Sequence, residues 1–435
     1  MYYEKAKKIE DYIINWRRHF HENPELSTLE FETIKSIKEE LKVLGIDFIE
    51  VPDGGILGFI KGNLPGDKKV LLRADVDALP VVEKENNLAG PRTCISKNVG
   101  VMHACGHDGH TAMLLGAAKL LVEEKDTFGG EVILCFERGE EGYSKYREIL
   151  AYMEKFHIVP DAIWAIHLVS TLETGVFGIR DDSMMAGSIF FEITLEGQGG
   201  HGSRPDQAIN PISAFTAIYN YFETIRLVKM DPFETLSYSI GTVNAGVASN
   251  VIPQTLNFKG TVRFMDREKI GMPFYLEFKD KLEKLANAYD CKVNFDFYPK
   301  PGFPVVNDKT AAVWSRNLLA KEFGEDNVTI PEPWMASESF AGYLTQWPGV
   351  YAFLGVKNEE KGIGAAHHNE YFDIDEDVLA MGTAGSVMYA INFLNSDLVL
   401  EDRPLKGNFR EYLKEVDETE ENIERLFSVD KQEIQ

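Results

Sequence analysis

Short apolar runs and segments of helical periodicity alternate along the first 170 residues. Residues 4–20 have apolar side chains at helical spacing, and a second helix is predicted to open at Ser27 and Glu30, which have capping-box spacing, and to end before Gly45. Compact runs rich in β-branched residues predict strands at residues 55–60, 70–76, 131–136 and 161–167. A helical pattern lies between them at residues 111–124. Buried strands that alternate with helices are typical of a largely parallel sheet in an α/β domain.

The pattern changes near Met184. Residues 189–197 alternate like a half-exposed strand and are followed by helical and strand patterns in the order of a ferredoxin-like α+β unit. These later patterns lie at residues 211–229, 236–243, 256–264, 267–289 and 292–298. The α/β pattern resumes after Pro301, with helices near 311–323 and 376–393 and a strand at 349–355. We therefore predict an α/β domain, with helices on both faces of its sheet, formed by residues 1–183 and 300–396. A second domain, residues 184–299, is inserted into it.

Charge and cysteine content narrow the possible classes of protein. The 435 residues include 69 acidic and 45 basic side chains, a net charge of −24 that disfavours nucleic acid and anionic membranes as partners. No apolar run approaches the ~20 residues that span a bilayer, and the first residues lack the apolar core of a signal peptide. Four cysteines are too few for a disulfide scaffold, so we expect a cytoplasmic protein. Residues 397–435 read as an acidic tail, either a surface helix or partly disordered.

One nine-residue segment concentrates the residues that bind metals. Residues 102–110, MHACGHDGH, contain three histidines, a cysteine and an aspartate just before a predicted helix. Thiolate and imidazole are good ligands for Zn²⁺ and similar ions. The plainer alternative is a polar helix cap with incidental histidines.

Further candidate ligands follow other predicted strands. Glu140 and Glu141 come just after the strand at 131–136, and His167 ends the strand at 161–167. Each signal is weak alone, because glutamate pairs are usually solvated and single histidines are usually structural. Together with Cys105 and His107 they fall at strand exits, the edge where open α/β sheets place ligands. The late pair His367-His368 completes a set sufficient for two metal ions.

These motifs resemble the amidohydrolase branch of the aminoacylase and carboxypeptidase family of dinuclear metallopeptidases. That branch includes N-acyl-amino-acid amidohydrolases, hippurate hydrolases and auxin-conjugate hydrolases. The matching segments are in family order between about residues 16 and 393, and the most specific are RADVDALP and HACGHDGH. Others are RRHFHENPELS, GQGGHGSRP, SNVIP, GTVRF and HHNEYFDIDEDVL. The implied activity is hydrolysis of the amide bond of small N-acyl amino acids or related conjugates.

The resemblance also implies roles for individual residues. The ligands of two divalent ions (Zn, Mn, Co or Ni) would be Cys105, His107, Glu141, His167 and His368. Of the late pair, His368 matches because it lies four residues before Phe372. Glu140 would be the general base that takes a proton from the attacking water. Asp75 and Asp77 would hold the ligands in place, Asp75 standing where peptidase relatives carry a metal-binding histidine.

The inserted domain matches the family's satellite domain, which typically forms a homodimer. His201 would hold the scissile carbonyl oxygen, often across a subunit interface, and Asn250 and Arg263 match other satellite positions. Arg263 could pair with a substrate carboxylate. Hinges near residues 182–186 and 298–302 would let this domain close over the metals.

The chain departs from the family pattern at two places beside these residues. Many relatives read Gln-Pro-Ala before the two glutamates, where this chain has Glu137-Arg138-Gly139. Relatives often read Ser-Glu-Asp-Phe, where this chain has Ser337-Glu338-Ser339-Phe340. The ligands survive both changes, but the pocket and the substrate are expected to differ.

Other functions are open at this point. A serine hydrolase is disfavoured because no nucleophile-elbow G-x-S-x-G occurs. A cysteine protease using Cys105 leaves Glu141, His167 and His368 without roles. A non-catalytic metal-binding protein has no need of Glu140. Within the family, the alternative is a dipeptidase or carboxypeptidase.

Overall fold

The computed structural model describes residues 1–142, 145–403 and 405–435, and its larger sheet has eight strands. The four central strands, β4, β3, β5 and β16, run parallel, and antiparallel pairs occur at β1–β2, β2–β4 and β16–β6. Across the sheet the order is β1 (Asp47–Val51), β2 (Gly55–Lys61), β4 (Gly129–Glu137), β3 (Leu64–Asp75), β5 (Ala162–Glu173), β16 (Gly349–Lys357), β6 (Phe177–Gly178) and β15 (Val328–Thr329). The mostly parallel α/β fold expected from the sequence is confirmed.

Helices cover both faces of this sheet and bury separate apolar cores. The larger core lies under α1 (Tyr2–Lys8), α2 (Glu10–Glu22), α3 (Phe31–Val43), α4 (His107–Glu123), α8 (Lys309–Phe323) and α10 (Leu379–Leu394). The opposite face is covered by α5 (Tyr146–Lys155), α9 (Phe340–Gln346), α11 (Phe409–Glu415) and α12 (Glu420–Ser428). Both faces are thus removed from water, as parallel sheets require.

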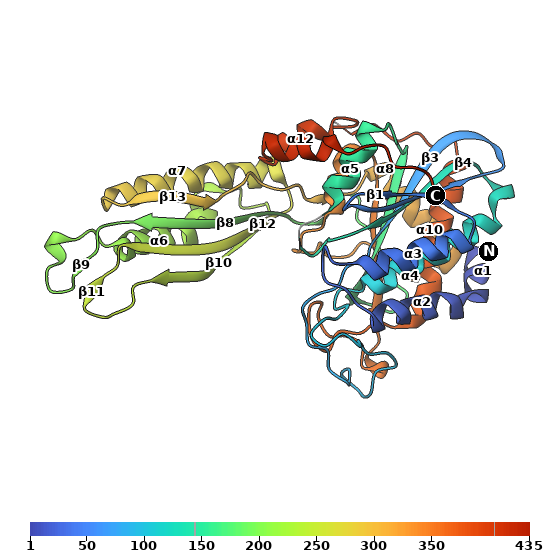
Figure 1. Cartoon of the computed structure of the whole chain (residues 1–435), viewed down its shortest axis with the longest axis horizontal. Helices are drawn as coiled ribbons and strands as arrows, with labels where there is room; N and C mark the ends of the chain where they lie inside the picture. Colours follow the sequence, from blue (N-terminus) through green and yellow to red (C-terminus); the bar gives the residue numbers. More distant parts are fainter. Residues whose placement is uncertain (143–144, 404) are drawn as a thin grey trace.

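A smaller antiparallel sheet extends from the first as an arm (Figure 1). Its order is β10 (Leu236–Ala245), β12 (Thr255–Phe264), β8 (Gly187–Glu196) and β13 (Lys292–Phe297), with α6 (Pro211–Lys229) and α7 (Met272–Ala288) packed on a third apolar core. This is the ferredoxin-like arrangement. A short pair, β9 (Gly200–His201) and β11 (Val251–Ile252), forms the far tip of the arm (Figure 1).

The chain passes between the two sheets through one antiparallel pair, β7 (Ser183–Met185) and β14 (Val305–Val306). Gly302 donates its backbone N–H to the carbonyl of Ser188 beside this pair. Two crossings held side by side are the geometry that a hinge between the sheets needs. The domain limits and hinges given above remain predictions.

The predicted capping box at Ser27 and Glu30 is wrong. Glu30 is itself the residue before α3, makes no side-chain cap, and is fully buried. Its carboxylate instead accepts hydrogen bonds from Arg138 Nε at 2.9 Å and from the backbone N–H of Gly139 at 2.8 Å. Ser27 donates to Asp77. Long-range polar partners, which spacing along the chain does not reveal, have displaced the local cap.

The C-terminal segment is better ordered than the acidic tail expected from its composition. One face of α11 and α12 is buried, and the residues that bury it are Phe409, Tyr412, Leu413, Ile423 and Leu426. The last residue, Gln435, exchanges two backbone hydrogen bonds with Phe48 of edge strand β1. The segment therefore completes the second apolar core. Its amphipathic pattern was hard to recognise in the sequence because acidic residues lie between the apolar positions.

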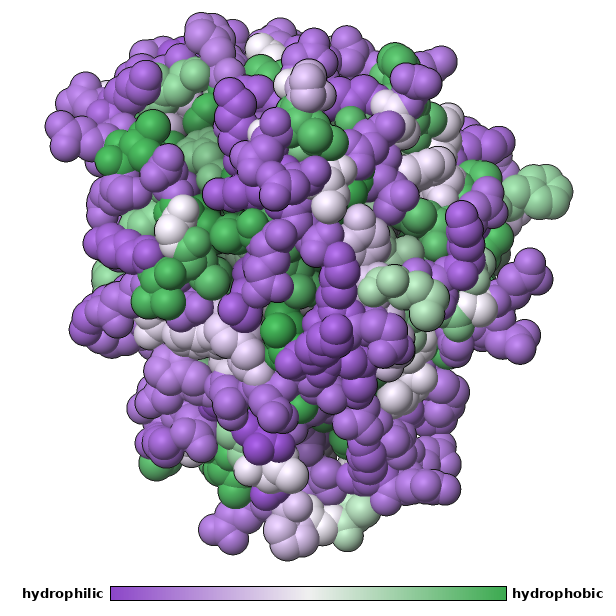
Figure 2. Space-filling view, turned by 90° about the vertical axis from the view of Figure 1, so that its right-hand side faces the viewer, coloured by the Kyte–Doolittle hydropathy of each residue, from purple (hydrophilic) through white to green (hydrophobic). Residues whose placement is uncertain are grey.

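One helical segment among the described residues, Glu376–Leu394, is long and apolar enough to span a membrane by length and composition, and 83% of that stretch is buried inside the protein. It includes α10 and packs against α4. The expectation that no apolar run approaches such a length was therefore too strict. The end of the larger domain is mostly hydrophilic, with apolar side chains scattered among polar ones (Figure 2).

The packing of the C-terminal segment gives a first prediction. Leu413→Ala removes a fully buried side chain of α11 and should lower the free energy of unfolding by about 2–5 kcal/mol. Lys414→Ala changes the exposed neighbour and should shift it by about 0.5 kcal/mol or less. Urea unfolding followed by circular dichroism measures both. Equal stability of the two variants would mean that α11 contributes nothing to the core.

Candidate metal centre and active site

The candidate ligands come from the loop before α4, from the loop after β4 and from the middle of β5. Cys105 and His107 flank Gly106, the residue before α4, whose φ of 91° lies in the left-handed region that favours glycine. Both side chains lie close to His167, which does not end its strand as expected, because β5 continues to Glu173. The Sγ of Cys105 is 3.6 Å from Nε2 of His167. Ligand atoms of Cys105, His107 and His167 all lie within 4.8 Å of one another.

A second group of donors adjoins the first. Ligand atoms of Cys105, Glu141 and His368 also lie within 4.8 Å of one another, and His107 forms a similar group with Glu140 and Glu141. Nε2 of His368 is 3.0 Å from Oε1 of Glu141. Cys105 thus belongs to both groups, and the two adjacent groups could hold two neighbouring cations.

The buried carboxylate of Asp77 orients this site from behind. It lies 3.1 Å from Nδ1 of His107, so that nitrogen carries the proton and Nε2 keeps its lone pair for a cation. Its other oxygen accepts the backbone N–H of Glu141 at 2.9 Å and the hydroxyl of Ser27. Asp77 therefore fixes two candidate ligands at once.

His167 is oriented by the backbone beside it. Its Nδ1 donates to the carbonyl of Leu168 at 2.7 Å, which leaves Nε2 as the nitrogen facing Cys105. The N–H of Leu168 in turn donates to Nε2 of His110 at 2.8 Å, and Nδ1 of His110 lies 2.6 Å from Asp75. Both nitrogens of His110 are occupied. His110 was not predicted to have a role, although its position one helical turn after His107 places both on one face of α4.

The two late histidines differ in what their nitrogens contact. Nε2 of His367 accepts the N–H of Ser170 at 3.3 Å, so the proton of the neutral ring sits on Nδ1, which lies 3.7 Å from Sγ of Cys105. Burial and the neighbouring His368 lower the pKa of His367 to about 3, which keeps the ring neutral. His367 then has no lone pair left for a cation, whereas His368 reaches Glu141 through Nε2.

The chemistry of the donor set fits divalent cations. Nε2 of His107 is buried without a hydrogen-bond partner among the residues described, and the buried Oε1 of Glu141 makes no hydrogen bond although Nε2 of His368 lies 3.0 Å away. Burial, and then the charge of Glu141, raise the pKa of the Cys105 thiol well above its usual value. A nucleophilic thiolate is therefore disfavoured in the protein alone, which argues against a cysteine protease. A bound cation reverses that shift and satisfies the buried donors.

Glu140 lies beside the candidate ligands and also belongs to a hydrogen-bond network that includes Ser339. Its Oε1 accepts the backbone N–H of Ser339 at 3.1 Å. Burial, followed by the carboxylates of Glu338 and Glu141, raises the pKa of Glu140 well above its usual value. A carboxylate with raised proton affinity next to a metal-type cluster has the character of a proton acceptor.

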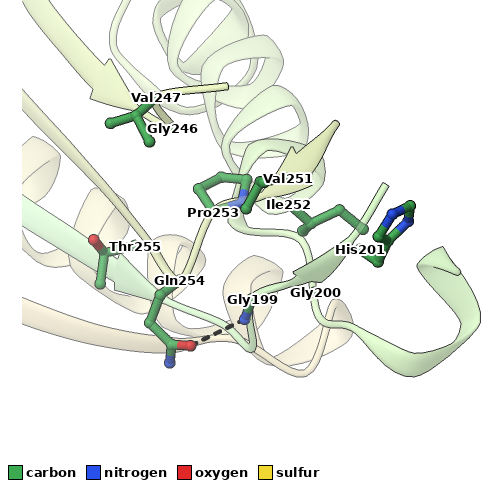
Figure 3. A pocket seen from close by; sticks show the side chains of 10 residues that line it. All are labelled: Gly199, Gly200, His201, Gly246, Val247, Val251, Ile252, Pro253, Gln254 and Thr255. Carbon is green, nitrogen blue, oxygen red and sulfur yellow. Dashed lines mark hydrogen bonds between the residues drawn. The ribbon is translucent and has the colours of Figure 1, made fainter. Parts of the chain in front are cut away.

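The satellite residues are not brought to this cluster within one chain. His201 and Asn250 lie at the tip of the arm, far from the strand ends of the larger sheet (Figure 1). His201 is exposed, and its Nδ1 accepts from Ser203 Oγ at 2.8 Å. It borders a hollow of about 580 Å³ lined mainly by apolar residues of the β9–β11 tip, drawn in Figure 3.

Arg263 lies at the other end of the arm, next to the larger domain. Its guanidinium stacks 4.7 Å from the ring of Phe190, and NH1 lies 3.3 Å from the hydroxyl of Ser337. Ser337 is two residues before Ser339, whose backbone N–H donates to Glu140. Of the three predicted satellite residues, Arg263 alone thus lies close to the site in its own chain.

With this geometry in view, comparison with known proteins identifies the family. Residues 71–390, more than half of the chain, match the model of peptidase family M20/M25/M40. The chain belongs to this family. It is therefore a hydrolase of amide bonds, and the resemblance found in its motifs is confirmed.

Relatives of this M20 enzyme match over nearly their whole length. It is 38% identical to "Thermostable carboxypeptidase 2" of Saccharolobus solfataricus, with 90% of this chain and 97% of that protein covered. It is 33% identical to "IAA-amino acid hydrolase ILR1-like 4" of Arabidopsis thaliana, covering 88% and 86%. A solved structure from Bacillus subtilis, described as a dinuclear metal binding peptidase from the M20 family, superposes with a TM-score of 0.73 at 29% identity, covering 89% and 99%.

The cysteine at the centre of the site gives a direct test. Cys105→Ala should lose most bound metal, because it removes the donor shared by both groups. Cys135→Ala is the matched control, since Cys135 is equally buried in β4 but contacts the hydroxyl of Tyr343 and no candidate ligand. Metal content after dialysis, measured by plasma mass spectrometry, distinguishes them. Equal metal content in both variants would exclude Cys105 as a ligand.

Proposed function

We propose that this M20 enzyme removes the acyl group from N-acyl amino acids or similar amino acid conjugates. The observation that carries the proposal is Glu140 lying beside a five-donor cluster that includes Cys105. Support for the substrate class comes from the relative named an IAA-amino acid hydrolase. The carboxypeptidase relative favours the alternative, a peptide with a free carboxyl terminus.

The proposed metal ligands are those implied by the motifs: Cys105, His107, Glu141, His167 and His368. Two divalent ions bound there, Zn, Mn, Co or Ni, would supply Lewis acidity towards the amide carbonyl and would acidify a water. Asp77 keeps Nε2 of His107 available, and the carbonyl of Leu168 does the same for His167. Asp75 acts through His110, which holds the backbone next to His167.

Glu140 is the proposed general base. Its raised proton affinity suits a group that accepts a proton from the attacking water and delivers it to the leaving nitrogen. The N–H of Ser339 holds one carboxylate oxygen, so the side chain is positioned before substrate binds.

The satellite arm is proposed to complete the site by dimerisation. His201 and Asn250 lie too far out on the arm to serve their own chain's site as the arm stands (Figure 1). A two-fold dimer built from satellite domains would present the tip of one arm to the other subunit's site. His201 would then stabilise the developing oxyanion, Asn250 would help bind the substrate, and Arg263 would pair with its carboxylate. Movement at residues 182–186 and 298–302 would close the arm over the site.

The proposed location is cytoplasmic. All four cysteines are buried and unpaired, the state expected in a reducing compartment.

Replacing the proposed base should separate catalysis from metal binding. Glu140→Gln keeps the size of the side chain, so metal content should persist while kcat falls by about 10²–10⁴-fold. Glu131→Gln, near the start of the strand β4 that precedes Glu140, is the control and should keep its activity. The assay uses N-acetyl and N-benzoyl amino acids and dipeptides with Mn²⁺, Zn²⁺, Co²⁺ and Ni²⁺. A near-normal kcat in Glu140→Gln would exclude Glu140 as the base, and a preference for dipeptides would favour the peptidase alternative.

Mixing two inactive proteins tests the role of His201. Glu140→Gln and His201→Ala homodimers should each be inactive. After subunit exchange, a heterodimer has one site with an intact Glu140 that receives His201 of the partner subunit, so activity should reappear. Exchange is monitored by native mass spectrometry. Confirmed exchange without recovery would rule out sharing between subunits.

A further inference from the structure

A buried arginine, Arg73, forms ion pairs with three carboxylates near the proposed base. Arg73 of β3 donates from Nε to Glu137 at 3.0 Å and from NH1 to Asp75 at 2.6 Å. Its NH2 lies 2.7 Å from the hydroxyl of Ser339 and 3.0 Å from Glu338. All five side chains are buried. One guanidinium therefore balances three carboxylates away from solvent, a group that tolerates little change in charge.

Ser339 connects this network to Glu140. Its hydroxyl accepts from Arg73 and donates to Oε1 of Glu137 at 2.6 Å, while its backbone N–H donates to Glu140 at 3.1 Å. The side chain of Ser339 thus locks the residue whose backbone holds the base. Any displacement of that side chain moves the N–H that positions Glu140.

The turn from β4 to Glu140 is held from its other side as well. Glu30 accepts from Arg138 and from the N–H of Gly139, and Gly139 has a φ of 67°, in the left-handed region. Glu137, Arg138 and Gly139 are thus each fixed by a buried charged partner. The backbone before Glu140 is therefore held in place. The distance from the Ser339 N–H to Glu140 then depends mainly on the contact between Glu137 and Ser339.

Both departures from the family pattern fall on this one hydrogen bond. Where many relatives have glutamine, this chain has Glu137, and where relatives often have aspartate, it has Ser339. In this chain the pair carries one carboxylate, on the Glu137 side of the contact.

We propose that Glu137 and Ser339 are a coupled pair of positioning residues, which hold Glu140 in its working place as long as the pair carries a single carboxylate paired with Arg73. Glu137 acts through Ser339, and Ser339 acts through its backbone N–H. The inference rests on Glu140 being the base.

The test is a four-protein cycle of wild type, Glu137→Gln, Ser339→Asp and the double variant. Ser339→Asp places a fourth carboxylate around Arg73, at the 2.6 Å contact with Glu137, and like charges there must separate. The backbone of residue 339 should shift and kcat should fall about 10²-fold, the typical cost of a misplaced group, with KM little changed. Glu137→Gln removes the charge that holds Arg73 and should lower kcat less.

The double variant restores one carboxylate to the pair, because the introduced glutamine can donate a hydrogen bond to the introduced aspartate. It should recover about tenfold or more of the kcat lost in Ser339→Asp. Ser339→Asn is the matched control for size: it adds the bulk of aspartate without the charge and should stay close to wild type. If Ser339→Asp fails to fold, an active double variant is itself the expected rescue.

Two outcomes would overturn the proposal: a double variant no more active than Ser339→Asp, or a loss in Ser339→Asn equal to that in Ser339→Asp. Metal content is measured in each protein at saturating metal, so that a lower kcat is not caused by missing metal. The Glu140→Gln assay separates failure of the base assignment from failure of the coupled pair. If that variant is active the base assignment fails, whereas an inactive Glu140→Gln with no rescue in the cycle removes only the coupled pair.

Discussion

The cost of burying many ionisable groups at one sheet edge governs this structure. Cysteine, histidine and carboxylate side chains form overlapping groups of three whose ligand atoms lie within 4.8 Å of one another, and the neighbouring carboxylates Asp75, Asp77 and Glu137 are buried too. Such groups lose their hydration and must find cations or hydrogen-bond donors in exchange. Arg73 pairs with carboxylates on one side of the site, and the proposed ligand set around Cys105 fits divalent ions on the other. Strands β3, β4 and β5 and the loops that follow them position both Arg73 and the proposed metal ligands.

Two kinds of support keep the site in order. Both proposed histidine ligands of the first group have their second nitrogen occupied, His107 by Asp77 and His167 by the carbonyl of Leu168, so the free nitrogen is set before a cation binds. The proposed base is held differently, through a backbone N–H whose position depends on a buried ionic network. The first arrangement concerns affinity for metal and the second concerns placement of a proton acceptor. Separate measurements can therefore address them.

Much of this could be predicted from the sequence, and the failures have physical causes. Apolar runs marked the buried strands, and donors that follow strands marked the site, although His167 lies inside β5 rather than at its end. The capping box failed because Glu30 met Arg138, 108 residues away in sequence. The link from Ser339 to Glu137 spans 202 residues and could not be seen from spacing at all. A surface helix was one expectation for the C-terminal segment, but its packing on the second core was missed because acidic residues masked the apolar face.

The central claim is that Cys105 is a ligand in a centre of two metal ions. X-ray absorption spectroscopy of the zinc-loaded wild-type protein tests it most directly, because sulfur and nitrogen neighbours scatter differently. We expect sulfur scattering at about 2.3 Å together with nitrogen and oxygen at about 2.0–2.2 Å, and two zinc ions per chain. A spectrum fitted by nitrogen and oxygen alone, or one zinc ion per chain with no sulfur neighbour, would contradict it.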